Sequence, residues 1–184
     1  MIQFVLVILV FILFFLYDVN QTTWHRKTLQ PFFLLGCLLL GATTLLVMIQ
    51  VSRGADLHLV YLLPAIVCLL FLTYVLFFAL PFKDTYIKES GNIVYRQGAY
   101  ALCRHPGFWL LSGFYLFVSL AIRCQEMEQI FILTTLLNLA YVLFQDHYTF
   151  MRQFEDYASY KQEVPFLLPT IHSMRTCVKT WRKN

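Results

Sequence analysis

Long apolar runs alternate with short polar segments along the whole chain. Five runs contain no Asp, Glu, Lys or Arg: residues 2–17, 31–51, 58–82, 106–122 and 129–145. An α-helix needs about 17–25 apolar residues to cross the hydrocarbon core of a bilayer. The pattern therefore predicts an all-α integral membrane protein, a bundle of about five transmembrane helices in a single membrane domain that covers residues 1–184.

The ends of these runs refine the prediction. The first run lacks the basic region and the small-residue cleavage site of a signal peptide, so we expect it to be retained as a helix. Pro31 is expected near a helix start, whereas Pro64 lies inside the third run and can kink it. The fourth and fifth runs are close to the minimum spanning length, so we expect their helices to reach the headgroup region through polar ends.

Composition supports the membrane assignment and narrows the chemistry. Of the 184 residues, 59% are hydrophobic and 13% are charged, whereas a soluble domain has about 25% charged residues. The five cysteines are odd in number and form no Cys-x-x-Cys pair, so neither a disulfide framework nor a zinc site is expected. The isolated His25, His58 and His172 give no reason to expect another metal site.

Basic residues predict the orientation of the bundle. With the N-terminus outside, twelve of the 14 Lys and Arg residues fall on the cytoplasmic side, and only Arg53 and Arg123 do not. We therefore expect a multi-pass protein with a cytoplasmic C-terminus and a polar cytoplasmic face, with Glu126 and Glu128 in the short outer loop. This topology accounts for the net charge of +4, so no nucleic-acid partner is expected.

The chain divides by composition into N-terminal helices (1–82), a segment that carries most of the polar residues (83–169) and a basic tail (170–184). Basic residues beside a membrane are attracted to anionic lipids. The tail is therefore expected to contact the bilayer surface.

The sequence Arg104-His105-Pro106 is expected to form the cytoplasmic start of the fourth helix. Pro106 biases His105 away from helical angles and suits the first helical position. Arg104 would then lie at a helix N-terminus, which favours anions, with a guanidinium that suits a carboxylate or a phosphate. Two interpretations stay open: an anion site, or an interfacial anchor with its stem in lipid.

Further polar residues follow the fifth run. An acid at the position of Asp146 is costly unless it faces protein or water, so Arg104 or a cationic ligand is its expected partner; an exposed helix end is the alternative. Tyr157 and Tyr160, three residues apart, share one face of a short interfacial C-terminal helix, which Val164-Pro165 is expected to end.

Several of these segments form an ordered set: Gly98-Ala-Tyr100, Arg104-His105-Pro106-Gly107-Phe108, Gln145-Asp146, Tyr157-Ala-Ser-Tyr160 and Val164-Pro165-Phe-Leu-Leu-Pro169. In this order, and at these helix ends, the set resembles the isoprenylcysteine carboxyl methyltransferases and their bacterial and phospholipid N-methyltransferase relatives. The resemblance covers residues 93–169, about the C-terminal half of the chain.

The resemblance implies methyl transfer from S-adenosylmethionine, bound in a cytoplasmic pocket between the last two helices and the tail. The acceptor it implies is a lipophilic small molecule or a prenylated substrate that enters from the lipid bilayer. By analogy, the cofactor would be lined by Asn92, Ile93, Val94, Tyr95, Gly98, Tyr100, Arg104, His105, Pro106, Phe108, Gln145 and Asp146. The catalytic candidates are Arg104, Asp146 and Glu155, of which the two acids are candidate bases for an amine acceptor. The candidate substrate contacts are Tyr141 and Tyr157.

Some positions depart from the family pattern. Phe108 replaces a tyrosine, Leu110 a glycine and Gln145 a glutamate. The stretch Tyr141-Val-Leu-Phe144 lacks the arginine expected to hold the acceptor carboxylate in the prenylcysteine enzymes. A non-catalytic membrane protein that binds a lipid or a partner is therefore one alternative. An NADPH-dependent reductase of sterol-like lipids is another, although residues 107–111 lack the acid that such enzymes carry after Arg-His-Pro.

Overall fold

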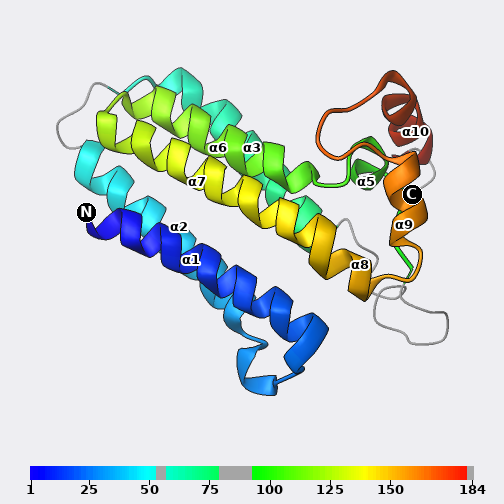
Figure 1. Ribbon diagram of the computed structural model, residues 1–184. Coiled ribbons are helices and arrows are strands. Elements are labelled where there is room, and N and C mark those ends of the chain that lie inside the picture. Colours follow the sequence, from blue (N-terminus) through cyan, green and yellow to red (C-terminus); the bar gives the residue numbers. More distant parts are fainter. Residues whose placement is uncertain (53–56, 79–92, 182–184) are drawn as a thin grey trace.

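The computed structural model describes residues 1–52, 57–78 and 93–181. All regular secondary structure in these residues is helical and they contain no β-strand, as the sequence predicts. Figure 1 shows long helices that lie side by side in a bundle, with short helices gathered at one end.

Four helical segments are long and apolar enough to cross a membrane. With the short turns that adjoin them, they are α1 (Ile2–Val19) with η1 (Asn20–Trp24), η2 (Lys27–Leu29) with α2 (Phe32–Ser52), η3 (Leu59–Tyr61) with α3 (Leu62–Phe77), and α7 (Gln125–Phe144) with η4 (Gln145–Thr149) and α8 (Phe150–Gln153). They overlap the predicted apolar runs, because an uncharged run of this length has its backbone satisfied in lipid only as a helix. The last segment extends beyond the predicted 129–145 at both ends, and residues 79–82 of the third run lie outside the described residues.

The fourth predicted run forms α6 (Pro106–Ile122), a shorter apolar helix of 17 residues. At a rise of 1.5 Å per residue it is about 25 Å long, slightly less than the hydrocarbon core of about 30 Å. It packs against both α3 and α7. The main-chain N–H of His58 donates to the carbonyl of Ala121 at 2.8 Å, which ties the start of the third segment to the end of α6.

The start of α7 differs from the prediction. The helix begins at Gln125, so Glu126 and Glu128 lie in its first turn and not in a loop. Two effects favour this earlier start: acidic side chains suit the positive end of a helix dipole, and the Cys124 sulfur accepts a hydrogen bond from the Met127 N–H at 3.4 Å. In a hydropathy pattern, charged residues in the first turn of a helix therefore look the same as charged residues in a loop.

Pro64 also differs from the prediction. It lies in the first turn of α3, where a missing N–H breaks no helical hydrogen bond, so it does not kink the helix interior. Pro31 directly precedes α2, as predicted, and its carbonyl accepts the N–H of Leu35 at 2.9 Å.

Two clusters of buried apolar side chains hold the bundle together. One joins α2, α3, α6 and α7 and consists of Val47, Ala65, Tyr115, Val118, Ile122, Met127 and Ile130. The other is a single face of α1, formed by Val7, Val10, Phe11 and Phe14 at helical spacing. Outside these clusters, leucines such as Leu34, Leu38 and Leu45 are exposed. An apolar outer surface is what a lipid-facing bundle requires.

Short helices gather at the end of the bundle where α6 begins (Figure 1): α5 (Ala99–Leu102), α9 (Tyr157–Glu163) and α10 (Ile171–Trp181). Tyr157 and Tyr160 share one buried face of α9, and the helix ends at Val164, as predicted. The Tyr160 hydroxyl donates to the carbonyl of Tyr100 at 2.7 Å. Tyr160 therefore ties α9 to the α5 region, and both tyrosines are buried.

Candidate functional site

The Arg104-His105-Pro106 segment forms the start of α6, as predicted. Pro106 occupies the first turn of the helix, and His105 precedes it with non-helical angles (φ −125°, ψ 65°). The N–H of Arg104 donates to the carbonyl of Pro165 at 3.0 Å. The segment is therefore fixed between the start of a long helix and the chain that follows α9.

Asp146 lies at the centre of a buried ion-pair network. Its carboxylate is 1% exposed and lies 3.1 Å from Nε of Arg104 and 2.9 Å from Nζ of Lys161. The Tyr157 hydroxyl donates to the same carboxylate at 2.7 Å, and Nε2 of His105 lies 3.5 Å away. Arg104 is thus a buried partner of Asp146 and not an interfacial anchor, and Asp146 is not an exposed helix end.

The π-helical turn η4 explains why Asp146 faces inward. A π-turn widens the helix by one residue and rotates the side chains that follow, and such turns occur often at functional sites. Here both Asp146 and Thr149 are turned into the protein, each 1% exposed, whereas His147 between them is exposed.

Burial and the network set the protonation of the groups around Asp146. Burial lowers the pKa of His105, against the opposing effect of the Asp146 carboxylate. Burial also raises the pKa of Tyr157, and the hydrogen bond to Asp146 raises it further. Both side chains are therefore neutral near pH 7.

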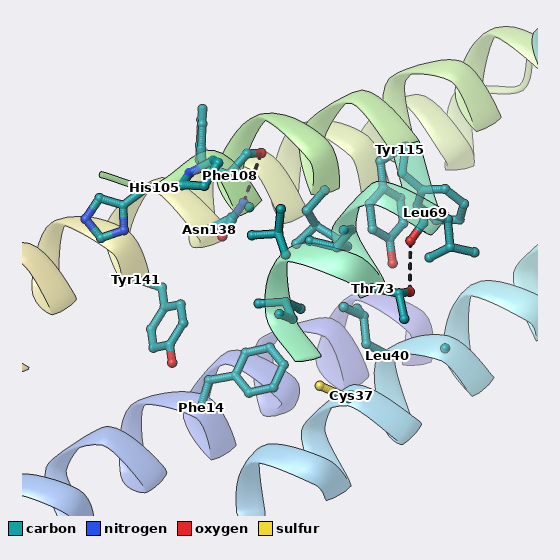
Figure 2. A pocket seen from close by; sticks show the side chains of 18 of the residues that line it. Phe14, Cys37, Leu40, Leu69, Thr73, His105, Phe108, Tyr115, Asn138 and Tyr141 are labelled. Carbon is teal, nitrogen blue, oxygen red and sulfur yellow. Dashed lines mark hydrogen bonds between the residues drawn. The ribbon is translucent and has the colours of Figure 1, made fainter. Parts of the chain in front are cut away.

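A cavity of about 740 Å³ lies beside this network, between α1, α2, α3, α6 and α7. At the end near α5 and η4 its polar lining residues are Tyr100, Arg104, His105, Asn138, Tyr141 and Gln145. Figure 2 shows His105, Asn138 and Tyr141 at this end, and Leu40, Leu69 and Tyr115 farther into the bundle. The remaining lining is almost entirely apolar. The volume falls in the range of about 300–1,000 Å³ that is usual for small-molecule sites.

Two polar lining residues are held by backbone carbonyls. The Tyr100 hydroxyl donates to the carbonyl of Val75 at 3.1 Å, and the Asn138 amide donates to the carbonyl of Phe108 at 3.5 Å, drawn in Figure 2. These bonds connect α5 to α3 and α7 to α6. The polar end of the cavity is therefore set by contacts between elements far apart in the sequence.

The structure brings only part of the predicted site to the cavity. The predicted residues that line it are Tyr100, Arg104, His105, Pro106, Phe108, Tyr141 and Gln145. Asp146 and Tyr157 lie behind this wall, in the ion-pair network. Asn92 lies outside the described residues.

The other predicted residues lie away from the cavity lining. Ile93 is 59% exposed, and the N–H of Val94 donates to the Asp156 carboxylate at 2.8 Å. Gly98, at φ 58°, is bound to α10 through Thr180, and the Tyr95 ring packs edge-on against Tyr100. Glu155 is exposed and is not among the residues that line the cavity, so its position does not suit a base at this site.

Sequence reasoning missed two charged residues near the cavity. Lys161 pairs with Asp146 only because α9 folds back onto η4, which no local pattern indicates. Asp18, the acid that ends the first apolar run, is 4% exposed and faces Tyr141, Gln145 and Thr149. In the sequence, Asp18 is a lone charge at the end of an apolar run. The predicted orientation gave no reason to single it out.

No group of three or more His, Cys, Asp and Glu side chains that could hold a metal ion occurs within residues 1–52, 57–78 and 93–181. Comparisons of the chain with protein-family models, with curated proteins and with solved structures find no match.

Proposed function

We propose that this protein is an integral membrane methyltransferase that transfers a methyl group from S-adenosylmethionine to a lipophilic acceptor at the cytoplasmic face of the membrane. The observation that carries the proposal is the cavity between the helices, which is polar near α5 and η4 and apolar over the rest of its length. A cavity of this kind suits one polar ligand and one lipid-like ligand whose reactive ends meet.

The polar lining suits S-adenosylmethionine. Nε of Arg104 and Nε2 of His105 are buried and make no hydrogen bond within the described residues, although both approach Asp146. Each can therefore donate to a carboxylate or hydroxyl oxygen of a ligand. Tyr100 and Phe150 supply aromatic surface for an adenine ring. When bound, S-adenosylmethionine supplies a methyl group on a positively charged sulfur.

The apolar lining suits a long-chain acceptor. Residues of α6 from Pro106 to Val118 line the cavity, a rise of about 18 Å along the helix axis. The residues that α2 and α3 contribute at the far end include Leu45, Met48 and Ile66. A hydrocarbon tail in this part would bury apolar surface at about 25 cal/mol per Å², and its reactive head would face the polar end.

The protein's own residues would act mainly by position. Phe150 stacks on the His105 ring with the centroids 5.7 Å apart, and Asp146 holds Arg104 beside it. The side chains of His105 and Arg104 would then bind and orient a polar ligand, while the apolar walls exclude water. Positioning and water exclusion are the main contributions that a methyl transfer between two bound reactants requires.

Calorimetry tests the proposal. Purified protein in detergent is titrated with S-adenosylmethionine and, separately, with NADPH. We expect S-adenosylmethionine to bind with a Kd on the order of micromolar, and His105→Ala to weaken it by about tenfold or more because a buried donor is lost. His172→Ala is the matched control, since His172 is exposed on α10, and it should leave the affinity unchanged.

The other outcomes separate the alternatives. Binding of NADPH alone would refute methyl transfer and favour the reductase. Binding of neither compound would favour a non-catalytic protein that keeps the cavity for a lipid. Arg104→Ala is a poorer test, because it also removes a partner of Asp146.

A further inference from the structure

Asn138 is a polar side chain in the interior of a helix that is long enough to cross the membrane. It lies on α7, well before the helix ends at Phe144, and the residue is 6% exposed. A buried amide is costly unless both its nitrogen and its oxygen find hydrogen-bond partners. The presence of Asn138 at this depth therefore calls for a partner for each of the two atoms.

The amide nitrogen of Asn138 has a partner, and the amide oxygen has none. Nδ2 donates to the carbonyl of Phe108 at 3.5 Å. This bond also fixes which end of the amide is the nitrogen, because two carbonyl oxygens cannot form a hydrogen bond with each other. Within the described residues no group donates to Oδ1. An amide oxygen can accept two hydrogen bonds, so Oδ1 keeps its whole capacity for a ligand.

The unpaired oxygen faces the cavity. Asn138 lines the cavity, and Oδ1 is not one of the side-chain atoms that are sealed off without a partner. Its bonded neighbour Phe108 lies on α6 between His105 and Tyr115. Figure 2 likewise shows Asn138 between His105 and Tyr115. The oxygen therefore lies where the polar end of the cavity passes into the apolar part.

The hydroxyl groups that line the apolar part are paired within the protein. Thr44 and Tyr115 share a hydrogen bond, and Thr44 also donates to a carbonyl one turn earlier in α2 at 2.8 Å. Thr73 donates to a carbonyl one turn earlier in α3 at 2.9 Å, drawn in Figure 2. Unlike these hydroxyl groups, Oδ1 of Asn138 needs a donor that only a ligand can bring.

The charges around the cavity favour a neutral donor. Among the described residues that line it there is no acidic side chain, since both Asp18 and Asp146 lie outside the lining. Asp146 is shared by two cations, Arg104 and Lys161. The lining therefore offers no carboxylate to an ammonium group. A carboxylate head would bring no hydrogen to Oδ1 of Asn138, whereas a hydroxyl group brings a hydrogen without a charge.

We infer that the cavity binds a long-chain alcohol whose hydroxyl group donates a hydrogen bond to Oδ1 of Asn138. The hydrocarbon chain lies in the apolar part, along Leu111, Phe114 and Val118 of α6. Burial of the chain supplies affinity, and the hydrogen bond fixes the position of the head and selects a neutral donor. The inference goes beyond the proposed methyl transfer and does not depend on it, because it concerns only the recognition of the lipid.

Three probes with the same chain test the inference: oleyl alcohol, methyl oleyl ether, which has no donor, and oleylamine, which has a charged one. Each is added at the same mole fraction to the full chain in a neutral detergent, and the thermal unfolding midpoint is measured. We expect oleyl alcohol to raise the midpoint most, by about 3 °C more than the ether, which corresponds to a roughly fivefold difference in Kd. Asn138→Leu should remove the difference between alcohol and ether. Thr134→Val, which removes a buried hydroxyl of α7 outside the cavity lining, should retain it.

Three results would overturn the alcohol site. Equal shifts with alcohol and ether in the wild-type chain would show that Oδ1 receives no hydrogen bond from the ligand. A largest shift with oleylamine would show that the site prefers a positive charge. A difference between alcohol and ether that survives in Asn138→Leu would leave Asn138 only the structural role of tying α7 to α6. Binding of S-adenosylmethionine is measured separately, so methyl transfer and the alcohol site can each fail while the other stands.

Discussion

At the scale of single residues, the stability of the bundle end depends on whether each buried charge has a partner. Asp146 is almost fully buried and is compensated by two cations and a tyrosine hydroxyl. Breaking a buried ion pair by removing one partner leaves the other charge uncompensated. Arg104, whose side chain is 9% exposed, cannot regain water without local unfolding.

Asp146→Asn is therefore expected to destabilise the protein by about 3 kcal/mol. The measurement is the free energy of unfolding in detergent by a denaturant titration. Glu155→Gln is the control, because Glu155 is an exposed acid nearby, and it should change the free energy by less than about 0.5 kcal/mol. Equal values for the two variants would mean that the network contributes nothing.

Asp18→Asn should have the opposite effect. The amide has nearly the shape of the carboxylate but no charge, so it removes the cost of an unpaired buried ion. We expect the ligand-free variant to unfold at a higher temperature than the wild-type chain. A loss of stability like that of Asp146→Asn would show that Asp18 already has a positive partner in the folded protein.

The same two acids illustrate how far the site could be predicted. The pairing of Asp146 with Arg104 was predictable, because a charge at the end of one apolar run needs a partner at the end of a neighbouring run. Lys161 was not predictable, because its contact depends on how α9 folds back. Asp18 was not predictable, because its burial depends on the rotation of α1 against α7, which apolar runs do not specify.

At the scale of elements, the long helices were predictable and the segments around them were not. Hydrophobic length alone predicts a spanning helix, because lipid leaves the backbone no other partner. By contrast, α5, α9 and α10 lie where they do through specific contacts. The Arg96 side chain, for example, forms ion pairs with two carboxylates of the α9 region, those of Asp156 and Glu163.

The contact between Arg96 and Asp156 should make this region sensitive to acid. Burial opposes the Asp156 charge, but the Val94 N–H and Arg96 offset that effect and lower the pKa of the carboxyl group. In the unfolded chain an Asp has a pKa of about 3.9. The stabilisation is therefore fully present above about pH 4 and is lost as the pH falls through the lower pKa of the folded state.

Asp156→Asn is thus expected to lower the thermal unfolding midpoint near pH 7, and the gap from the wild-type chain should narrow as the pH falls below about 4. The check is a series of melting curves across this pH range for both chains. Glu155→Gln, with no such contact, should track the wild-type curve throughout. A gap that stays constant with pH would rule out the ion pair as its source.

The sequence of α10 predicts a helix that lies on the membrane. Ile171, Met174, Val178 and Trp181 are exposed and spaced along one face, beside the basic Arg175 and Lys179. Such a helix inserts its apolar face at the headgroup boundary, with help from anionic lipid. The basic tail was predictable from charge, whereas its apolar face becomes evident only once the residues are placed on a helix.

We expect amide hydrogen exchange in α10 to be slower in nanodiscs that contain phosphatidylglycerol than in nanodiscs of phosphatidylcholine alone. Val178→Glu should remove this difference, because it puts a charge into the apolar face. His172→Glu adds the same charge on another face of the helix and should reduce the difference far less. Equal exchange in both lipids for the wild-type chain would exclude the lipid contact.

At the scale of the whole molecule, the position of α6 decides how many times the chain crosses the membrane. By length and composition, four helices can span and α6 falls just short. Yet α6 packs against α3 and α7, and its last turn is bonded to the start of the third segment. We therefore expect α6 to cross the membrane together with its neighbours, since local thinning of the bilayer tolerates a shortfall of a few ångströms.

Five crossings with an outer N-terminus, the arrangement that we expect, would put the α6–α7 turn outside and the η1, α8 and α9 region in the cytoplasm. We expect a cysteine introduced at Glu126, in a chain without its native cysteines, to react with a membrane-impermeant thiol reagent in intact cells. Cysteines at Lys27 and Glu155 should react only after permeabilisation. All three positions are exposed in the fold, so a difference in labelling reports the side of the membrane. Labelling of Lys27→Cys in intact cells would show that the orientation is the reverse of the expected one. The polar end of the cavity would then face away from the cytoplasm and from the proposed supply of S-adenosylmethionine.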